Sequence, residues 1–333
     1  MPYKKVAISM GDPAGIGPEI ALKAALDERV RKVCRTLLVG DRRALAMHAA
    51  GCGIAPTVKS YKAAKDVDWA DDQIALLDLD QFGQQPLAIG KVHAAHGRAA
   101  VECARAAIDA ALAGHVDAVV AAPQTELSIK QAGIEFDGYP SFVARCTGVA
   151  PEDVFLMHCF GDTRIVHATL HVSLARAIEL VTRERVGNVI HAADRALRRL
   201  GIAAPRIAVA GLNPHAGENG MFGDEEARII APAIEAARSQ GVDAEGPFGA
   251  DTMFHRTGVD AFVVMYHDQG HVASKLLARN KIAGLAIGTP VLFSSVAHGS
   301  ALDIAGTGRA SADAVVEAVL RLVGAAERAR EAA

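Results

Sequence analysis

Short apolar runs alternate with longer amphipathic stretches along the chain. Runs of four or five apolar residues bounded by Gly, Pro or Asp predict strands, whereas apolar residues three or four positions apart predict helices. The clearest helical stripe lies within residues 94–113. The predicted strands cover residues 6–10, 36–39, 74–77, 116–121, 154–158, 165–169, 207–210, 261–264 and 284–287, and the predicted helices residues 16–26, 94–113, 173–180, 183–200, 224–240 and 312–326.

This alternation of strands and helices predicts an α/β fold with mainly parallel strands. A chain of 333 residues can form two domains, and it contains no Pro-, Gly- or Ser-rich linker and no internal repeat. Two domains joined without a linker usually share a broad cleft. The first domain is predicted to comprise residues 1–124 and 288–333, and the second residues 125–287.

Composition narrows the function. The 35 basic and 38 acidic residues nearly balance and form no block of one sign, which argues against a nucleic-acid partner. No apolar run approaches the roughly 20 residues that cross a bilayer, and the N-terminus does not resemble a signal peptide. Five scattered cysteines without a Cys-x-x-Cys pair favour reduced thiols. These features predict a cytoplasmic enzyme without a membrane partner.

A glycine-rich turn follows the first predicted strand. It reads Gly-Asp-Pro-Ala-Gly-Ile-Gly-Pro-Glu at residues 11–19. Its glycines allow backbone to approach a ligand, and the helix that follows would favour an anion. We therefore take Gly11 and Asp12 as candidate cofactor contacts. The spacing is not that of a dinucleotide fingerprint, and a turn without any ligand remains an alternative.

Three histidines stand beside turn residues after predicted strands. They are His171, His215 and His267. Imidazole is a common ligand of first-row divalent metals, and three ligands leave room for a substrate. A hydrogen-bonded structural role remains an alternative for each of them. Of the other histidines, His158 and His167 fall within strands, and His271 could enter the same site because it follows His267 by four residues.

Further candidates lie in the C-terminal half. Lys275 could bind a carboxylate or carry a proton, although a surface position remains an alternative. Asp251 follows a glycine-rich turn and is a candidate carboxylate for proton transfer. The small-residue loop at 298–308 predicts a nucleotide site, in which Asp303 can accept hydrogen bonds from ribose hydroxyls. His298, Gly299 and Ser300 begin this loop.

Together these stretches resemble the 4-hydroxythreonine-4-phosphate dehydrogenase family. The similar segments are GDPAGIGPE at 11–19, LNPHAGE at 212–218, GADT at 249–252, YHDQG at 266–270 and HGSALDIAGTG at 298–308. The last also resembles the nucleotide loop of isopropylmalate and isocitrate dehydrogenases, which share the general fold.

The resemblance implies two α/β/α domains, like those of isocitrate and isopropylmalate dehydrogenases, with the active site in the cleft between them. It also implies a homodimer with a shared active site, NAD or NADP as cofactor, and a divalent metal. Zinc is the first choice for the metal, with magnesium, manganese and cobalt as alternatives. It implies that His171, His215 and His267 are the metal ligands, one of them contributed by the partner subunit. Lys275 corresponds to the family's substrate lysine.

The chain also departs from the family pattern. The stretch Gly138-Tyr139-Pro140-Ser141 stands where phosphate-substrate members have Gly-His-Thr-Glu, and Gly284 and Phe293 align with a substrate Asn and Arg. Loss of the arginine would remove a charged contact to phosphate. These departures are similar to the terephthalate cis-dihydrodiol dehydrogenase branch, which implies a substrate pocket with Tyr139, Lys275 and Phe293.

We therefore expect metal-dependent, NAD-linked oxidation and decarboxylation of terephthalate 1,2-cis-dihydrodiol to protocatechuate. The alternative is a dehydrogenase of 4-hydroxythreonine-4-phosphate or a related phosphorylated hydroxy acid. A third class, an acyl-phosphate transferase or a metal-binding protein without catalysis, fits the histidines and the nucleotide loop less well.

Overall fold

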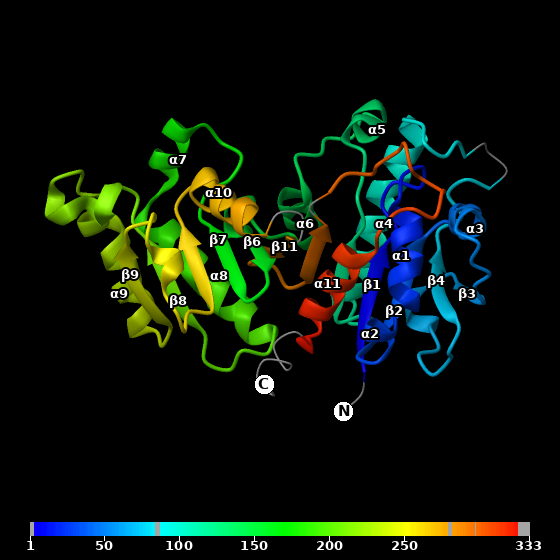
Figure 1. Cartoon of the computed structure of the whole chain (residues 1–333), viewed down its shortest axis with the longest axis horizontal. Helices are drawn as coiled ribbons and strands as arrows, with labels where there is room; N and C mark the ends of the chain where they lie inside the picture. The colour runs from blue at the N-terminus through cyan, green and yellow to red at the C-terminus, as the bar shows by residue number, and fades with distance from the viewer. Residues whose placement is uncertain (1–2, 84–86, 279–281, 297, 326–333) are drawn as a thin grey trace. The chain divides into compact units, whose positions relative to one another are not determined.

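The computed structural model describes residues 3–83, 87–278, 282–296 and 298–325. It divides into two compact units, one of residues 1–148 with 290–333 and the other of residues 149–289. The sequence placed these boundaries near residues 124 and 288. That assignment of independently folding domains stays a prediction. Each unit is built on its own set of strands (Figure 1).

Unit 1, formed by residues 1–148 and 290–333, contains strands in the order β3-β4-β2-β1-β5-β12, all parallel. Their central members are nearly continuous apolar runs, as expected for strands covered by helices on both faces. The strands are β1 Lys4–Ser9, β2 Cys34–Gly40, β3 Val58–Tyr61, β4 Ile74–Asp78, β5 Ala118–Ala121 and β12 Leu292–Val296.

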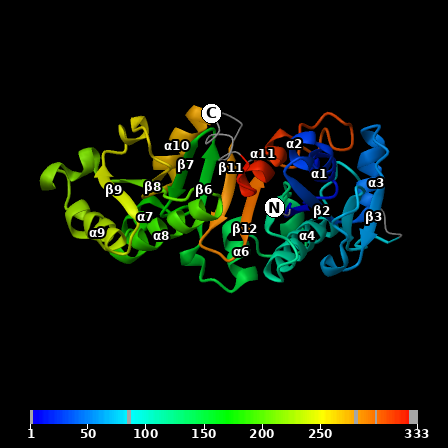
Figure 2. The same cartoon turned by 90° about the horizontal axis from the view of Figure 1, so that it is seen from below.

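Helices cover both faces of the unit 1 strands, with α1 and α11 on one side and α4 on the other (Figure 2). The buried face of α4 is rich in alanine, which lets the helix approach the strands closely. Asp41 caps α3 by accepting from the backbone N–H groups of Arg43 and Ala44. The helices are α1 Gly17–Leu26, α2 Glu28–Arg31, α3 Arg42–Gly51, α4 Ala94–Leu112, α5 Glu126–Gln131, α6 Tyr139–Thr147 and α11 Asp313–Leu322, with a 3₁₀ turn at Ala64–Asp66.

Unit 2, formed by residues 149–289, contains strands in the order β11-β6-β7-β10-β8-β9. β6 runs antiparallel to both β11 and β7, and the other pairs are parallel. The prediction of mainly parallel strands is therefore confirmed. The strands are β6 Phe155–Phe160, β7 Thr163–His167, β8 Arg206–Ala210, β9 Asp243–Phe248, β10 Ala261–Val264 and β11 Ala283–Ile287.

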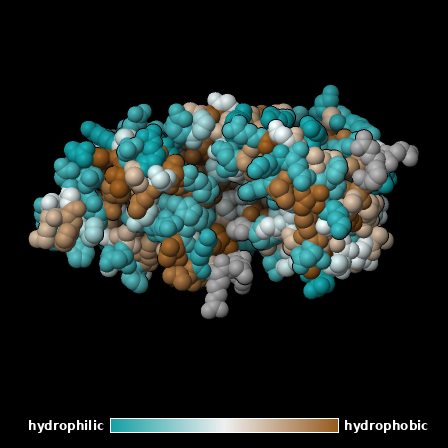
Figure 3. All heavy atoms as spheres, turned by 90° about the horizontal axis from the view of Figure 1, so that it is seen from above, coloured by the Kyte–Doolittle hydropathy of each residue, from teal (hydrophilic) through white to brown (hydrophobic). Residues whose placement is uncertain are grey.

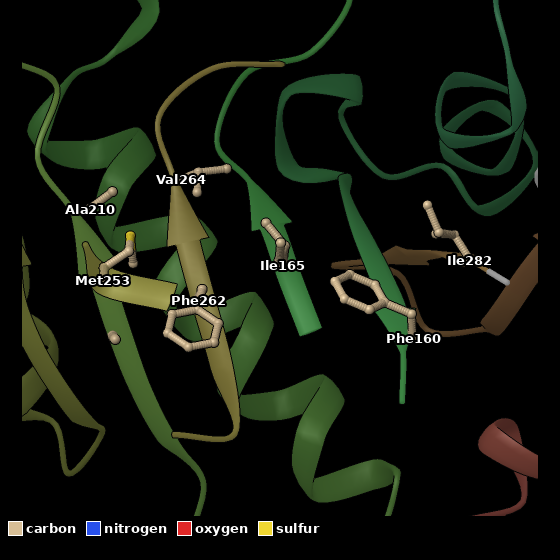
Figure 4. Close-up of a cluster of buried hydrophobic side chains, with 8 residues drawn as sticks. Phe160, Ile165, Ala210, Met253, Phe262, Val264 and Ile282 are labelled. Atoms are coloured by element: carbon tan, nitrogen blue, oxygen red, sulfur yellow. The ribbon is translucent and has the colours of Figure 1, made fainter. Parts of the chain in front are cut away.

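The unit 2 strands separate α8 and α9 on one face from α10 on the other (Figure 2). On the α10 face, Phe160, Ile165, Phe262 and Val264 form a buried cluster, against which the α10 alanines pack (Figure 4). This apolar cluster fixes α10 on the strands. The helices are α7 Leu174–Leu180, α8 Arg183–Arg199, α9 Ala231–Ser239 and α10 His267–Ala278, with 3₁₀ segments at Pro151–Asp153, Pro214–Gly220 and Met253–His255 and a π-helical turn at Glu226–Ile230.

All nine predicted strands and the six predicted helices have counterparts, within a few residues at their ends. The predictions missed several elements, among them α3, α6, α10, β9 and β12. Within the described residues, no helix combines the length and the apolar composition needed to cross a membrane.

Candidate metal and cofactor sites

His171 and His267 come together at one end of the unit 2 strands. Beyond β7 and β10 the two chain segments stay paired, because Ala168 N–H donates to Val264 O at 2.8 Å and Thr169 N–H to Met265 O at 3.2 Å. The segments then leave the sheet side by side. They place the rings of His171 and His267 with their centroids 5.5 Å apart.

The pair borders an open pocket of about 300 Å³. His267 begins α10, and its Nδ1 lies 2.6 Å from Asp268 Oδ1. A carboxylate at Nδ1 fixes the ring orientation and leaves Nε2 for a ligand, the arrangement common among metal-binding histidines. The pocket is lined by Leu170, His171, Val172, Leu174, Ala177, Tyr266, His267 and Asp268. The chemistry of these groups fits a divalent metal.

His215 lies on a loop with unusual backbone geometry. Residues 215–219 all have positive φ, between 42° and 82°. The His215 ring is exposed and contacts Phe222, while its Nδ1 lies 3.5 Å from Glu218 Oε2. Within the described part of one chain, His215 does not join His171 and His267 in a group of converging ligand atoms. Its role as the third metal ligand stays a prediction.

A buried glutamate anchors this loop. Oε1 of Glu226 accepts from the backbone N–H groups of Leu212 and Asn213, both at 2.7 Å, and Oε2 accepts from Asn213 Nδ2 at 3.0 Å. Burial alone would raise the pKa of Glu226, but these hydrogen bonds outweigh it and hold the pKa below its ordinary value. Sequence reasoning missed Glu226 because it lies inside a predicted helix.

Asp251, the candidate for proton transfer, and Lys275, the candidate for anion binding, are also exposed. Asp251 stands near His215, since a side chain at Gly249 would meet Asp251 Oδ1 at 2.9 Å and His215 Cα at 3.8 Å. Lys275 follows His267 by eight residues on α10, so the two share one helix face. Its charge contributes to lowering the pKa of His271, although burial of that ring is the larger cause.

In unit 1, the glycine-rich turn and the 298–308 loop meet at the carboxyl ends of the strands. Ile16 N–H donates to Ser300 O at 2.8 Å, and Thr125 Oγ1 donates to Ser300 Oγ at 3.0 Å. Gly15 permits this contact, because a Cβ there would lie 2.7 Å from Ser300 Cβ. The structure thus brings together the two segments that the sequence predicted as cofactor loops.

Within these loops the candidates differ in exposure. Asp12 is fully buried; its Oδ1 accepts from Ala14 N–H at 2.8 Å, and its Oδ2 has no hydrogen-bond partner within the part of the chain that the structure describes. His298, Gly299 and Asp303 are exposed, and Gly11 is buried with a positive φ of 64°. Asp303 is therefore accessible to a ligand, whereas Asp12 shapes the turn through its hydrogen bond to Ala14.

The predicted aromatic substrate contacts lie within unit 1. Phe293 is a core residue of β12 and only 1% exposed, and its ring packs against that of Tyr139 in a tilted contact with the centroids 5.0 Å apart. Tyr139 is half-buried and donates its hydroxyl to Ala122 O at 3.1 Å. Both side chains therefore have structural contacts of their own. Phe293 offers a ligand almost no surface in this chain, so its alignment with a substrate arginine gains no support.

The amino-acid sequence matches the model of the family described as pyridoxal phosphate biosynthetic protein PdxA over residues 32–321. The chain therefore belongs to the PdxA family. It is 40% identical over 332 residues to 4-hydroxythreonine-4-phosphate dehydrogenase of Geobacter metallireducens, an alignment that covers 98% of this chain and 96% of the relative. Membership of this family makes the chain a dehydrogenase.

Two solved structures are similar over nearly the whole chain. A 4-hydroxythreonine-4-phosphate dehydrogenase from Klebsiella pneumoniae has a TM-score of 0.85 at 36% identity, with 97% of this chain and all of that chain covered. A terephthalate 1,2-cis-dihydrodiol dehydrogenase from Burkholderia xenovorans has a TM-score of 0.77 at 38% identity, with 97% and 99% covered. The fold of the family is thus confirmed for this chain.

Proposed function

We propose that this chain is a metal-dependent, NAD-linked dehydrogenase that oxidises a phosphorylated hydroxy acid of the 4-hydroxythreonine-4-phosphate type. The observation that carries the proposal is the pair His171 and His267 beside the unit 2 pocket, with Lys275 on the same face of α10. Two imidazoles provide ligands for a divalent metal, and the ammonium provides a charge for an acidic substrate.

In the proposed reaction, each of these side chains has a separate role. His171 and His267 hold the metal, with His267 oriented by Asp268. Lys275 binds an anionic group of the substrate and so positions the hydroxyl. Asp251, exposed beside His215, takes up or delivers a proton. The oxidised product is a β-keto acid, which can lose carbon dioxide. A bound divalent metal would lower the pKa of a coordinated hydroxyl and would stabilise the negative charge that develops during this decarboxylation.

The cofactor belongs to the carboxyl edge of the unit 1 strands. The joined loops at 11–16 and 298–304 present the exposed Gly299 backbone to a dinucleotide and the Asp303 carboxylate to ribose hydroxyls, while the buried Gly11 and Ser300 shape and join the loops. NAD supplies the hydride acceptor. Neither loop carries a feature that distinguishes NAD from NADP.

The homodimer remains part of the proposal. Hydrophobic side chains reach the surface of unit 2 around the pocket, where Val172 is 43%, Leu174 59% and Leu276 76% exposed. Brown patches among hydrophilic residues are visible on this half of the molecule in Figure 3. Such a surface suits burial against a second copy, which would also supply His215 as the third ligand.

Terephthalate cis-dihydrodiol is the second candidate substrate. The Gly138–Ser141 departure and the Burkholderia xenovorans structure favour it. The phosphate substrate is better supported, because the Geobacter metallireducens relative and the Klebsiella pneumoniae structure are both 4-hydroxythreonine-4-phosphate dehydrogenases. The argument from a lost arginine is also weakened, since Phe293 is buried in β12.

One assay separates these candidates. NADH formation would be followed with 4-hydroxythreonine-4-phosphate and with the dihydrodiol, each with zinc, magnesium or manganese and after chelation. We expect metal-dependent turnover of the phosphate compound. If only the diol is oxidised, the diol replaces the phosphate compound as the proposed substrate, and the assignment as a dehydrogenase stands. Full activity after verified removal of metal would refute the metal-dependent mechanism.

A further inference from the structure

Three buried histidines that the proposed reaction does not use converge beneath α10. His158 lies on β6, His167 ends β7 and His271 lies on the second turn of α10, and their side chains are 7%, 1% and 9% exposed. The β6–β7 register pairs His158 with Ile165, so His158 and His167 are diagonal neighbours on one sheet face. That face is the one that α10 covers.

The three rings form a tight group. Their centroids lie 4.3, 4.6 and 5.0 Å apart, and one ring nitrogen of each lies within 4.8 Å of the other two. Among the described residues, this is the group whose ligand atoms converge closely enough to share a metal ion. It lies beside the proposed reaction site, because His271 stacks on His267 at 3.7 Å.

Hydrogen bonds fix the same tautomer in all three rings. His167 Nδ1 lies 3.2 Å from Leu156 O and His271 Nδ1 3.2 Å from His267 O, so both Nδ1 atoms carry the proton. Ser274 donates its hydroxyl hydrogen to His271 O at 3.1 Å, and its oxygen then accepts from His158 Nδ1 at 3.0 Å. Each ring therefore keeps its lone pair on Nε2.

This arrangement is costly without a partner for those lone pairs. His167 Nε2 is buried and has no hydrogen-bond partner among the described residues, and an unsatisfied buried nitrogen costs roughly 1–3 kcal/mol. A bound cation would satisfy the lone pairs.

We propose that His158, His167 and His271 form a second metal site, separate from the reaction site and selective for zinc-like ions. Neutral imidazoles with Nδ1–H bound to an oxygen match the usual environment of metal-binding histidines. An all-nitrogen set favours zinc, cobalt, nickel or copper over magnesium or calcium, which prefer oxygen. Buried under α10, the ion would link β6 and β7 to that helix and stabilise unit 2.

The test uses variants that remove one Nε2 and keep the Nδ1 hydrogen bond. In His167→Asn the amide can still donate to Leu156 O but offers no ligand at the Nε2 position. The chelated protein would be re-equilibrated with zinc alone, and bound zinc measured by elemental analysis. We expect two zinc ions per wild-type chain and one in His167→Asn. His191→Asn on α8, outside the cluster, is the matched control and should retain both.

A second pair of variants separates this site from the reaction site. His215→Ala should retain one zinc, and His215→Ala with His167→Asn should retain none. If His167→Asn does not fold, His271→Asn, which keeps the bond to His267 O, replaces it. Cobalt bound to His215→Ala should give the visible absorption of a tetrahedral nitrogen site. A His215→Ala protein without zinc, or unchanged zinc in both asparagine variants, would overturn the proposal and leave the proposed function untouched.

Discussion

Lys275 is the single charged side chain that the proposed function relies on for substrate recognition. It is exposed and shares a face of α10 with His267, and the described residues form no salt bridge with it within 4.0 Å. An exposed ammonium on the helix that begins with His267 can bind an anionic group of a substrate. Its charge, rather than any packing contact, should therefore determine its contribution.

We predict that Lys275→Ala lowers kcat/KM by roughly 10- to 100-fold, because one charge-assisted hydrogen bond contributes about 1.5–3 kcal/mol. Lys275→Arg should recover much of this loss, and Lys130→Ala, an exposed lysine on α5, should have no effect. Steady-state kinetics with the acidic substrate measure the difference. Unchanged kcat/KM in Lys275→Ala would show that the lysine is only a surface residue.

Residue types at strand ends were predictable from the sequence, but their surroundings were not. Position after a strand indicated His171 and His267, and the structure brings them together. Nothing in the sequence showed that Phe293 would be 1% exposed, because an apolar residue in a short run fits a core strand and a pocket wall equally well. For His158 and His167 the sequence indicated a position in a strand but not whether their side chains would be buried.

Among structural elements, the loop at 212–219 depends on one carboxylate. Glu226 binds two backbone N–H groups of the loop, and its folded-state pKa is lowered below the ordinary 4.5. A lowered folded-state pKa means that the stabilisation is fully present above the unfolded-state pKa. It is lost as the pH falls through the folded-state value.

We predict that Glu226→Gln lowers the free energy of unfolding by about 1–3 kcal/mol at neutral pH, because an uncharged amide replaces charge-assisted acceptors. The difference between the variant and the wild type in the free energy of unfolding should shrink as the pH falls below about 4.5. Denaturant unfolding at several pH values measures it. Glu184→Gln, at an exposed position on α8, is the control. A difference that persists unchanged into acid would exclude the carboxylate as its source.

The two loops proposed to bind the cofactor depend on a glycine contact. Gly15→Ala would bring a Cβ to 2.7 Å from Ser300 Cβ, so one loop must move. We predict a KM for NAD raised roughly 10-fold or more, as expected when about 1.4 kcal/mol of binding is lost, with unchanged metal content. Gly187→Ala on α8, where an added Cβ meets nothing within 4 Å, is the control. Unaltered NAD binding in Gly15→Ala would show that the carboxyl end of the unit 1 strands, where these loops meet, is not the cofactor site.

At the scale of elements, periodic segments were predictable and polar helices were not. α4 has an apolar stripe, and the sequence located it closely. α10 was missed, because it begins His-Asp-Gln-Gly and leaves Val272, Leu276 and Leu277 exposed. Its outward apolar side chains break the usual pattern of a surface helix. A polar start and exposed apolar side chains together remove the amphipathic pattern by which surface helices are recognised in a sequence.

The proposed assembly concerns the whole molecule. His171 and His267 lie together in one chain, whereas His215 stands apart from them on its own loop. A metal site with three histidines would then combine the His171–His267 pair of one subunit with His215 of the other. In a twofold dimer this gives two equivalent sites, each using both chains.

This division predicts which inactive variants can complement each other. A heterodimer of His171→Ala and His215→Ala chains would contain one site with all three histidines and one that lacks two. Random reassociation of equal amounts should therefore restore about a quarter of wild-type activity, since half of the dimers are mixed and each has one working site. His171→Ala with His267→Ala should restore none, because every mixed site loses one ligand of the pair. Recovered NADH formation after verified subunit exchange measures this. Equal recovery in both mixtures, or recovery in neither, would contradict a shared site of this composition.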